Sequence, residues 1–189
     1  MEKGTAGPTR CGTSRRRPSF RILPFVPRPV ATTGARLLAL WRTLHPLPGG
    51  RWLFARLFAR AVPYSASTRP TVVVLEPGHA EVRIPDRRAN RQHLGSVHAI
   101  ALMNVAEMTS GLAMMAALPP QVRGIVREMK MEYFKKARGT ITAVSRVTVP
   151  DVTADVDFDV TADCLDPSGA VVARATVRWR LGLTPTRTS

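Results

Sequence analysis

The sequence is poor in cysteine, with Cys11 and Cys164 the two among 189 residues. Two cysteines do not make a disulfide framework, which excludes a disulfide-rich secreted domain and favours a reducing compartment, so we expect a cytoplasmic protein. The sequence also lacks a Gly-rich phosphate loop, a Cys/His spacing typical of a metal centre and a Ser/His/Asp order typical of a hydrolase triad. It therefore offers one catalytic site or none.

Acidic residues are scarce in the first third of the chain. Residues 1–60 hold twelve Lys and Arg residues and one acid, Glu2, and carry +11 of the formal net charge of +15. The remaining 129 residues have 16 basic and 12 acidic side chains. A mildly basic domain thus follows a very basic segment. That segment has enough charge for nonspecific phosphate contact, but we expect no specific nucleic-acid partner.

The N-terminal segment also lacks an uninterrupted apolar stretch. Residues 1–33 break every such stretch with Arg or Pro, so they predict a disordered basic arm and not a secretory signal, although the bias is also typical of a transit peptide. The one long apolar run, residues 98–118, contains His98, Asn104 and Glu107, which make it a poor membrane span. We expect no transmembrane segment.

Hydrophobic periodicity predicts an α+β domain. Residues 34–66 show two short helices that would pack on the domain, which we place at residues 67–185. A hairpin that turns at Pro77 and Gly78 precedes a buried helix from Val97 to Leu118. Four strands are expected after that helix, at residues 124–134, 139–149, 152–165 and 170–183. One long helix wrapped by an antiparallel sheet follows from this order.

The second of the short helices, residues 51–62, is amphipathic. Leu53, Phe54 and Phe58 share a face opposite Arg56 and Arg60. The pattern favours a helix that covers one edge of its own domain, and it leaves weak contact with a membrane surface as the alternative.

Several aspartates in the strand at residues 152–165 have a spacing that resembles a carboxylate metal site. They alternate with apolar residues, which is the period of a strand with one buried face. If Leu165 pairs with Ala170 across the turn, Asp157 faces Arg178 and Asp155 faces Arg180. We therefore expect a ladder of ion pairs here and no metal site.

Glu107 is the one acid in the apolar run. Burial of an unpaired carboxylate costs several kcal/mol or forces protonation, so this side chain needs a partner or a function. Either a backbone donor or an Arg from a neighbouring strand satisfies it, or it lines an apolar pocket as a base or nucleophile, with Asn104 one turn before it.

The start of the same helix supplies a second element. The backbone N–H groups of His98, Ala99 and Ile100 have no partner within the helix, and such groups can hold a developing oxyanion. The His98 side chain is either structural or a direct participant.

Together these residues resemble a known family. The chain contains the pattern N-x-x-x-x-G-x-x-H, here Asn90, Gly95 and His98, and an acid nine residues after the histidine, Glu107. This pattern is similar to that of hotdog-fold proteins, and specifically of PaaI-like acyl-CoA thioesterases. The segments "SVHAIAL", "EYFKKARG" and "PLPGGRWLFAR" are most similar to a branch described as a domain of unknown function. The resemblance covers residues 37–183.

The resemblance implies a role for individual positions. Glu107 would be the acid that acts on the thioester, Ala99 would supply the oxyanion N–H, and Gln92 would supply an amide beside it. The basic residues near the coenzyme A phosphates would be Lys135, Lys136 and Arg138. His98 and Asn104 complete the candidate catalytic set.

The implied function is hydrolysis of an acyl-CoA thioester in a pocket between subunits, by a homodimer or tetramer. Coenzyme A enters only as part of the substrate, and no cofactor is implied. The alternative is a non-catalytic acyl-binding or scaffold protein with a quenched site. Three positions depart from the family pattern: "HAI" replaces "HGG", the acid is Glu in place of the commoner Asp, and Arg127 stands where Ser or Thr is usual, close enough in the pattern to pair with Glu107.

Overall fold

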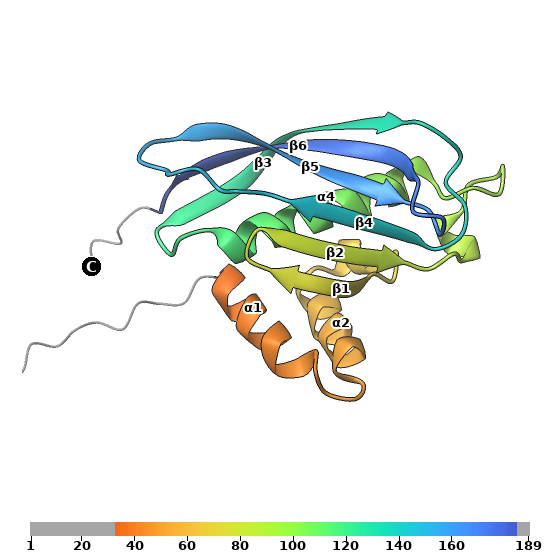
Figure 1. Ribbon diagram of the computed structural model, residues 1–189, viewed down its shortest axis with the longest axis horizontal. Coiled ribbons are helices and arrows are strands. Elements are labelled where there is room, and N and C mark those ends of the chain that lie inside the picture. The colour runs from red at the N-terminus through yellow and green to blue at the C-terminus, as the bar shows by residue number, and fades with distance from the viewer. Residues whose placement is uncertain (1–32, 185–189) are drawn as a thin grey trace, which may run out of the picture.

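The computed structural model describes residues 33–184, so all of the predicted N-terminal arm except Thr33 lies outside the described residues. Three helices come first, followed by a β-hairpin, a long helix and four further strands (Figure 1). In chain order the elements are α1 (Thr33–Leu44), α2 (Gly50–Ala61), α3 (Pro63–Ala66), β1 (Thr71–Glu76), β2 (His79–Ile84), the 3-10 helix η1 (Arg88–Asn90), α4 (Ala99–Ala117), β3 (Val122–Tyr133), β4 (Ile141–Arg146), β5 (Val156–Leu165) and β6 (Val171–Leu183).

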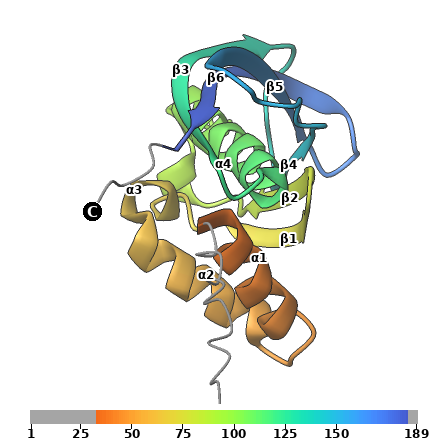
Figure 2. The same cartoon turned by 90° about the vertical axis from the view of Figure 1, so that its left-hand side faces the viewer.

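The six strands form one antiparallel sheet in the order β1-β2-β4-β5-β6-β3. The sheet curves around α4, as the end-on view of Figure 2 shows. Strand β3 follows α4 in the chain but crosses to the far edge of the sheet beside β6, which leaves β1 and β3 as the two edges. The α+β architecture predicted from the sequence is confirmed.

Helix α4 forms the centre of the core. It is long and apolar enough to cross a membrane, yet twelve of its nineteen residues are buried within the domain, which is the environment of a core helix. The helix begins after His98, which caps it, and ends at Ala117, with Leu118 as its C-cap before two prolines. Its predicted bounds, Val97 to Leu118, are correct to within two residues.

Helices α1 and α2 pack beside α4 and β1. Phe54 on α2 is fully buried and meets the Trp41 ring edge-on at a centroid distance of 5.1 Å. Gly34 lies against the backbone of α4, where an added Cβ would approach the Met115 carbonyl oxygen to 1.9 Å. Only glycine permits so close an approach of α1 to α4. Leu53, which the periodicity placed on the buried face of α2, is 41% exposed.

The pairing of β5 with β6 differs from the predicted register. Asp157 faces Arg180 and Asp159 faces Arg178, so the partners are shifted by two residues. The turn is closed by the hydrogen bond between Asp166 and Ala170, which shifts the register by one residue. An irregularity at Cys164 and Leu165 puts one extra residue into β6 and shifts the register by one more. A shift of two keeps each side chain on its face, so the predicted aspartate ladder forms with different partners.

Strand β3 contains a bulge at Arg127. Val126 pairs with Trp179 and Glu128 pairs with Arg178, so Arg127 has no residue opposite it on β6. The extra residue reverses the alternation along the strand. As a result Val126, Met129, Met131 and Tyr133 face the α4 side of the sheet.

Candidate functional site

Glu107 opens onto a cavity of about 360 Å³ on one side of α4. Three further residues of α4 line it, and the walls come from α3 and from the inner face of β3. The lining residues are Tyr64, Ser65, Ile100, Met103, Asn104, Glu107, Val126 and Met129. Glu107 is the one ionisable acid among these mainly apolar walls.

The Glu107 carboxylate has no hydrogen bond or ion pair with any residue of the described range 33–184. Ser110, one turn on, donates to the Glu107 backbone carbonyl at 2.8 Å and not to the carboxylate. The ion pair with Arg127 that would quench the acid is not formed, because Arg127 is the exposed bulge residue of β3. Burial raises the pKa of Glu107 above the usual range of a glutamate.

The first turn of α4 is capped by His98. The His98 Nδ1 atom accepts a hydrogen bond from the Ile100 N–H at 3.1 Å. This contact gives the His98 side chain a structural role in the described chain. The Ala99 N–H, by contrast, makes no hydrogen bond to any residue between 33 and 184. A free N–H at a helix N-terminus is suited to holding an anionic oxygen.

Gln92 lies in the loop that leads into α4. Its Nε2 atom donates to Ser96 Oγ at 2.8 Å, and its backbone N–H donates to the Ser96 carbonyl at the same distance. These two bonds hold the Gln92 side chain beside the start of the helix. Gln92 and Ala99 line a second cavity, of about 290 Å³, together with residues from the end of β3. Gln92 and Ala99 therefore line the same cavity.

Asn104 has a structural contact of its own. Its Nδ2 atom lies 3.4 Å from both the Ser65 carbonyl and Thr68 Oγ1, which tie α4 to α3 and the segment after it. Asn104 also lines both the Glu107 cavity and a neighbouring one of about 350 Å³ that His98 and Arg87 line. It shapes the wall of both cavities and does not approach the Glu107 carboxylate within hydrogen-bond distance.

The three basic residues predicted to meet phosphates follow β3. Lys135 and Lys136 line the cavity of Gln92 and Ala99, and all three side chains are exposed. Lys135 Nζ lies 2.7 Å from Asp166 Oδ2, and Lys135 and Ser168 together hold the pKa of Asp166 well below its usual range. Lys136 and Arg138 have no ion pair within the part of the chain that the structure describes.

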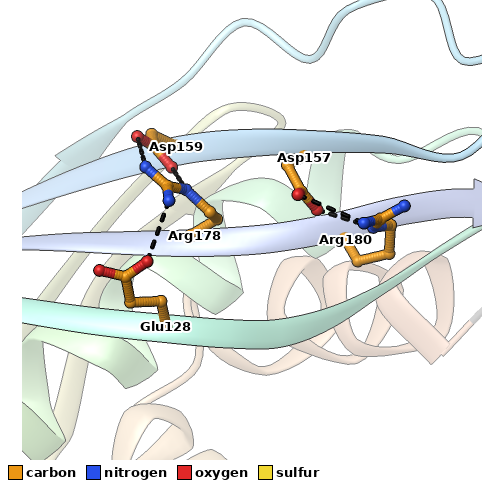
Figure 3. Close-up of polar contacts among 5 residues, drawn as sticks. All are labelled: Glu128, Asp157, Asp159, Arg178 and Arg180. Atoms are coloured by element: carbon orange, nitrogen blue, oxygen red, sulfur yellow. Dashed lines mark hydrogen bonds and ion pairs between the residues drawn. The ribbon is translucent and has the colours of Figure 1, made fainter.

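The aspartates of β5 are engaged by arginines of β6 (Figure 3). Arg178 donates to Asp159 at 2.8 and 3.1 Å and to Glu128 on β3 at 2.9 Å. The Arg180 guanidinium lies 2.7 Å from Asp157. The Arg178 contact lowers the pKa of Asp159. Among residues 33–184 no group of three or more His, Cys, Asp or Glu side chains is placed to hold a metal ion.

Cys164 is a free thiol in the core. It is fully buried, and burial raises its pKa to about 12. A thiol with such a pKa is not ionised at neutral pH, so Cys164 does not supply a nucleophile.

Comparison with known proteins identifies the family. The sequence pattern of a family described as a domain of unknown function, DUF4442, matches residues 50–181. The chain belongs to this family. A search of curated proteins found no match.

Solved structures share the fold of this DUF4442 protein. A structural genomics target is 32% identical, with 79% of this chain and 100% of the other covered and a TM-score of 0.71. A Pseudomonas aeruginosa protein of unknown function, described as a probable thioesterase, is 24% identical over 73% and 97% of the two chains, with a TM-score of 0.63. A thioesterase family protein from Silicibacter pomeroyi is 21% identical over 69% and 96%, with a TM-score of 0.59. The DUF4442 chain has the hotdog fold, as the resemblance implied.

The predicted site residues of the DUF4442 chain thus fall into two groups. Glu107 and Asn104 share one cavity, and Gln92, Ala99, Lys135 and Lys136 share another. His98 and Arg138 line neither of these two, and His98 instead lines the neighbouring cavity of about 350 Å³. Several wall residues were missed, among them Val126 and Met129 of β3 and Tyr64 and Ser65 of α3, whose four-residue helix gives no periodic signal. Tyr133 was also missed. Its hydroxyl lies 3.4 Å from the Ala99 carbonyl, and the "EYFKKARG" segment would have indicated it.

Proposed function

We propose that this protein hydrolyses an acyl-CoA thioester. The observation that carries the proposal is the Glu107 carboxylate, which opens onto an apolar cavity without a partner in residues 33–184 and has its pKa raised by burial. A carboxylate that is desolvated in this way is a stronger base than one in water. The Glu107 carboxylate is therefore suited to taking a proton from the water molecule that attacks the acyl carbon.

The acyl chain fits the cavity beside that acid. Met103, Val126 and Met129 give the walls an apolar surface, and Tyr64 covers one side. A cavity of about 360 Å³ lies within the range of small-molecule sites. In the proposed reaction Glu107 takes a proton from water, and the water oxygen bonds to the thioester carbon. The carbonyl then re-forms as the carbon–sulfur bond breaks, and the coenzyme A sulfur takes the proton that Glu107 holds and leaves as a thiol.

The Ala99 N–H is proposed to hold the oxygen that becomes negative when water adds. This N–H stands at the N-terminus of α4, where the helix dipole favours negative charge. Lys136 and Arg138, which have no ion-pair partner in the described residues, are proposed to meet the coenzyme A phosphates, with Lys135 shared between them and Asp166. Gln92 would orient the thioester beside Ala99.

The site is proposed to form between two copies of the chain. Strand β3 is an edge of the sheet and exposes Ile125 at 67% and Met129 at 47%. An edge strand of twelve residues with apolar side chains is a ready pairing surface. A homodimer made through this edge would bring the two groups of site residues from different copies together, and a dimer of such dimers would be a tetramer. We propose the reducing cytoplasm as the compartment.

The decisive experiment is hydrolysis of acyl-CoAs of short, medium and long chains by the wild type and by Glu107→Gln. We expect thioester cleavage by the wild type and a fall of two orders of magnitude or more for the variant, about the size of a general-base contribution. Full activity in the Gln variant overturns the role of Glu107. If acyl-CoA binds in calorimetry but is not cleaved at any chain length, the non-catalytic acyl-binding alternative is the correct one.

A further inference from the structure

Helices α1 and α2 form a hairpin on the side of the domain opposite β3, β5 and β6 (Figures 1 and 2). Its end, which we call the hairpin tip, consists of the α1–α2 turn and the first turn of α2. Three large apolar side chains there are exposed: Leu47 at 54%, Trp52 at 64% and Leu53 at 41%. The hairpin that carries them projects from the rest of the domain, as Figure 1 shows.

Trp52 and Leu53 point outward because the opposite face of α2 packs on the core. Phe54, next to Trp52 and Leu53 in sequence, is fully buried, and Phe58 one turn later packs on the same core. The turn itself is tight, because a Cβ on Gly50 would approach the Leu44 carbonyl oxygen to 1.7 Å. A helix fixed in this way cannot rotate to bury Trp52.

The hairpin is basic and contains no acidic residue. Residues 33–66 contain five arginines and no acid, and all five arginines are exposed. None of them forms an ion pair within the described range. The Arg56 guanidinium lies 5.2 Å from the Trp52 ring centroid, which places a cation beside this exposed aromatic ring. The five arginines are Arg36, Arg42, Arg51, Arg56 and Arg60.

We propose that the hairpin tip docks on an anionic lipid bilayer. Tryptophan prefers the interface between water and acyl chains, where its ring is buried and its N–H stays hydrated, and Leu47 and Leu53 would enter beside it. The exposed arginines would bind lipid phosphates, for which their planar guanidinium groups are suited. A hairpin with basic charge alone and exposed apolar side chains at its tip matches a negatively charged surface into which apolar side chains can insert.

Intrinsic fluorescence of the full chain tests the proposal, because the three tryptophans differ in exposure. Trp41 is 4% and Trp179 is 6% exposed, so Trp52 alone can meet lipid from the folded protein. We expect a blue shift of the emission with vesicles that contain one third phosphatidylglycerol in phosphatidylcholine, and quenching when the acyl chains are brominated. Pure phosphatidylcholine vesicles should give neither.

Variants separate insertion from simple charge attraction. Trp52→Phe should still sediment with anionic vesicles but lose the fluorescence response. Arg56→Gln should weaken the partition of the protein onto anionic vesicles by about fivefold, which is the contribution of one Arg near the lipid surface. Leu47→Glu with Leu53→Glu should abolish quenching, whereas the matched control Leu94→Glu, at another exposed leucine, should not. Thermal unfolding like that of the wild type confirms that each variant is folded.

Three results overturn the proposal. The first is no sedimentation with anionic vesicles. The second is sedimentation without quenching of Trp52, which shows that charge alone holds the protein on the vesicle and that the hairpin tip does not insert. The third is retention of quenching in the Leu47→Glu, Leu53→Glu double variant.

Discussion

Glu107 and Ala99 stand on the same helix and open onto different cavities. They are eight residues apart, which separates them by about 12 Å along the axis of α4 at a rise of about 1.5 Å per residue. Reacting atoms must approach to roughly 3 Å, so a single thioester cannot contact both groups of one chain. If both act on one substrate, they come from two copies of the protein.

Ala99→Pro is the sharpest test of the oxyanion N–H. Ala99 is the first residue of α4, the helical position that proline favours, and His98 already has the extended backbone required before proline (φ −65°, ψ 139°). The substitution removes one N–H with little strain. We expect a loss of about 10²–10³ in kcat with an unchanged melting temperature. Unchanged kcat would show that the Ala99 N–H takes no part in the reaction.

A mixing experiment tests whether the site is shared between copies. Glu107→Gln and Ala99→Pro are each expected to be inactive alone, but a mixed dimer contains one site with both an intact Glu107 and an intact Ala99 N–H. Random reassociation after mild unfolding makes half of the dimers mixed, so about one quarter of wild-type activity should return. Mixtures that stay at the activity of the separate variants would contradict a composite site.

The raised pKa of Glu107 predicts how stability depends on pH. The native state holds this proton at a higher pH than the unfolded chain, whose glutamate has a pKa of about 4.3. The favourable contribution is present below that value and is lost as the pH rises through the native pKa. Urea unfolding should therefore show that Glu107→Gln gains stability relative to the wild type between pH 4 and pH 8. A pH-independent difference would indicate a carboxylate that is well solvated.

Alanine substitutions at Phe54 and Trp52, two residues apart on α2, should change the free energy of unfolding by very different amounts. Phe54→Ala removes a fully buried ring between α1 and α2 and should lower the free energy of unfolding by about 3–5 kcal/mol. Trp52→Ala removes an exposed ring and should change it by no more than about 0.5 kcal/mol. Both values come from urea unfolding at neutral pH. A large loss for Trp52→Ala would mean that its ring supports the domain.

The elements with strong periodicity were predictable from the sequence. The uninterrupted apolar run indicated α4, and the Pro77-Gly78 pair between two apolar stretches indicated the β1–β2 hairpin. Glu107 was identified because a lone acid in such a run needs an explanation. Its lack of a partner in residues 33–184, in contrast, depends on where β3 places Arg127, and no local pattern fixes that.

Register and cavity walls were not predictable in the same way. The β5–β6 pairing depends on where the Asp166 turn closes and on one irregularity near Cys164, and both lie outside the two-residue period. The wall made by Tyr64 and Ser65 depends on how α3 packs against α4, a contact between segments about forty residues apart. Tertiary packing decides both.

The bulge in β3 makes Arg127 an extra residue in the sheet. From Val122 to Tyr133 the strand has twelve residues, while the part of β6 that pairs with it, from Ala173 to Leu183, has eleven. Loss of the Arg127 codon would leave every other residue of β3 on its present face and with its present partner. A single-codon deletion would therefore remove the Arg127 guanidinium without rebuilding the fold around it.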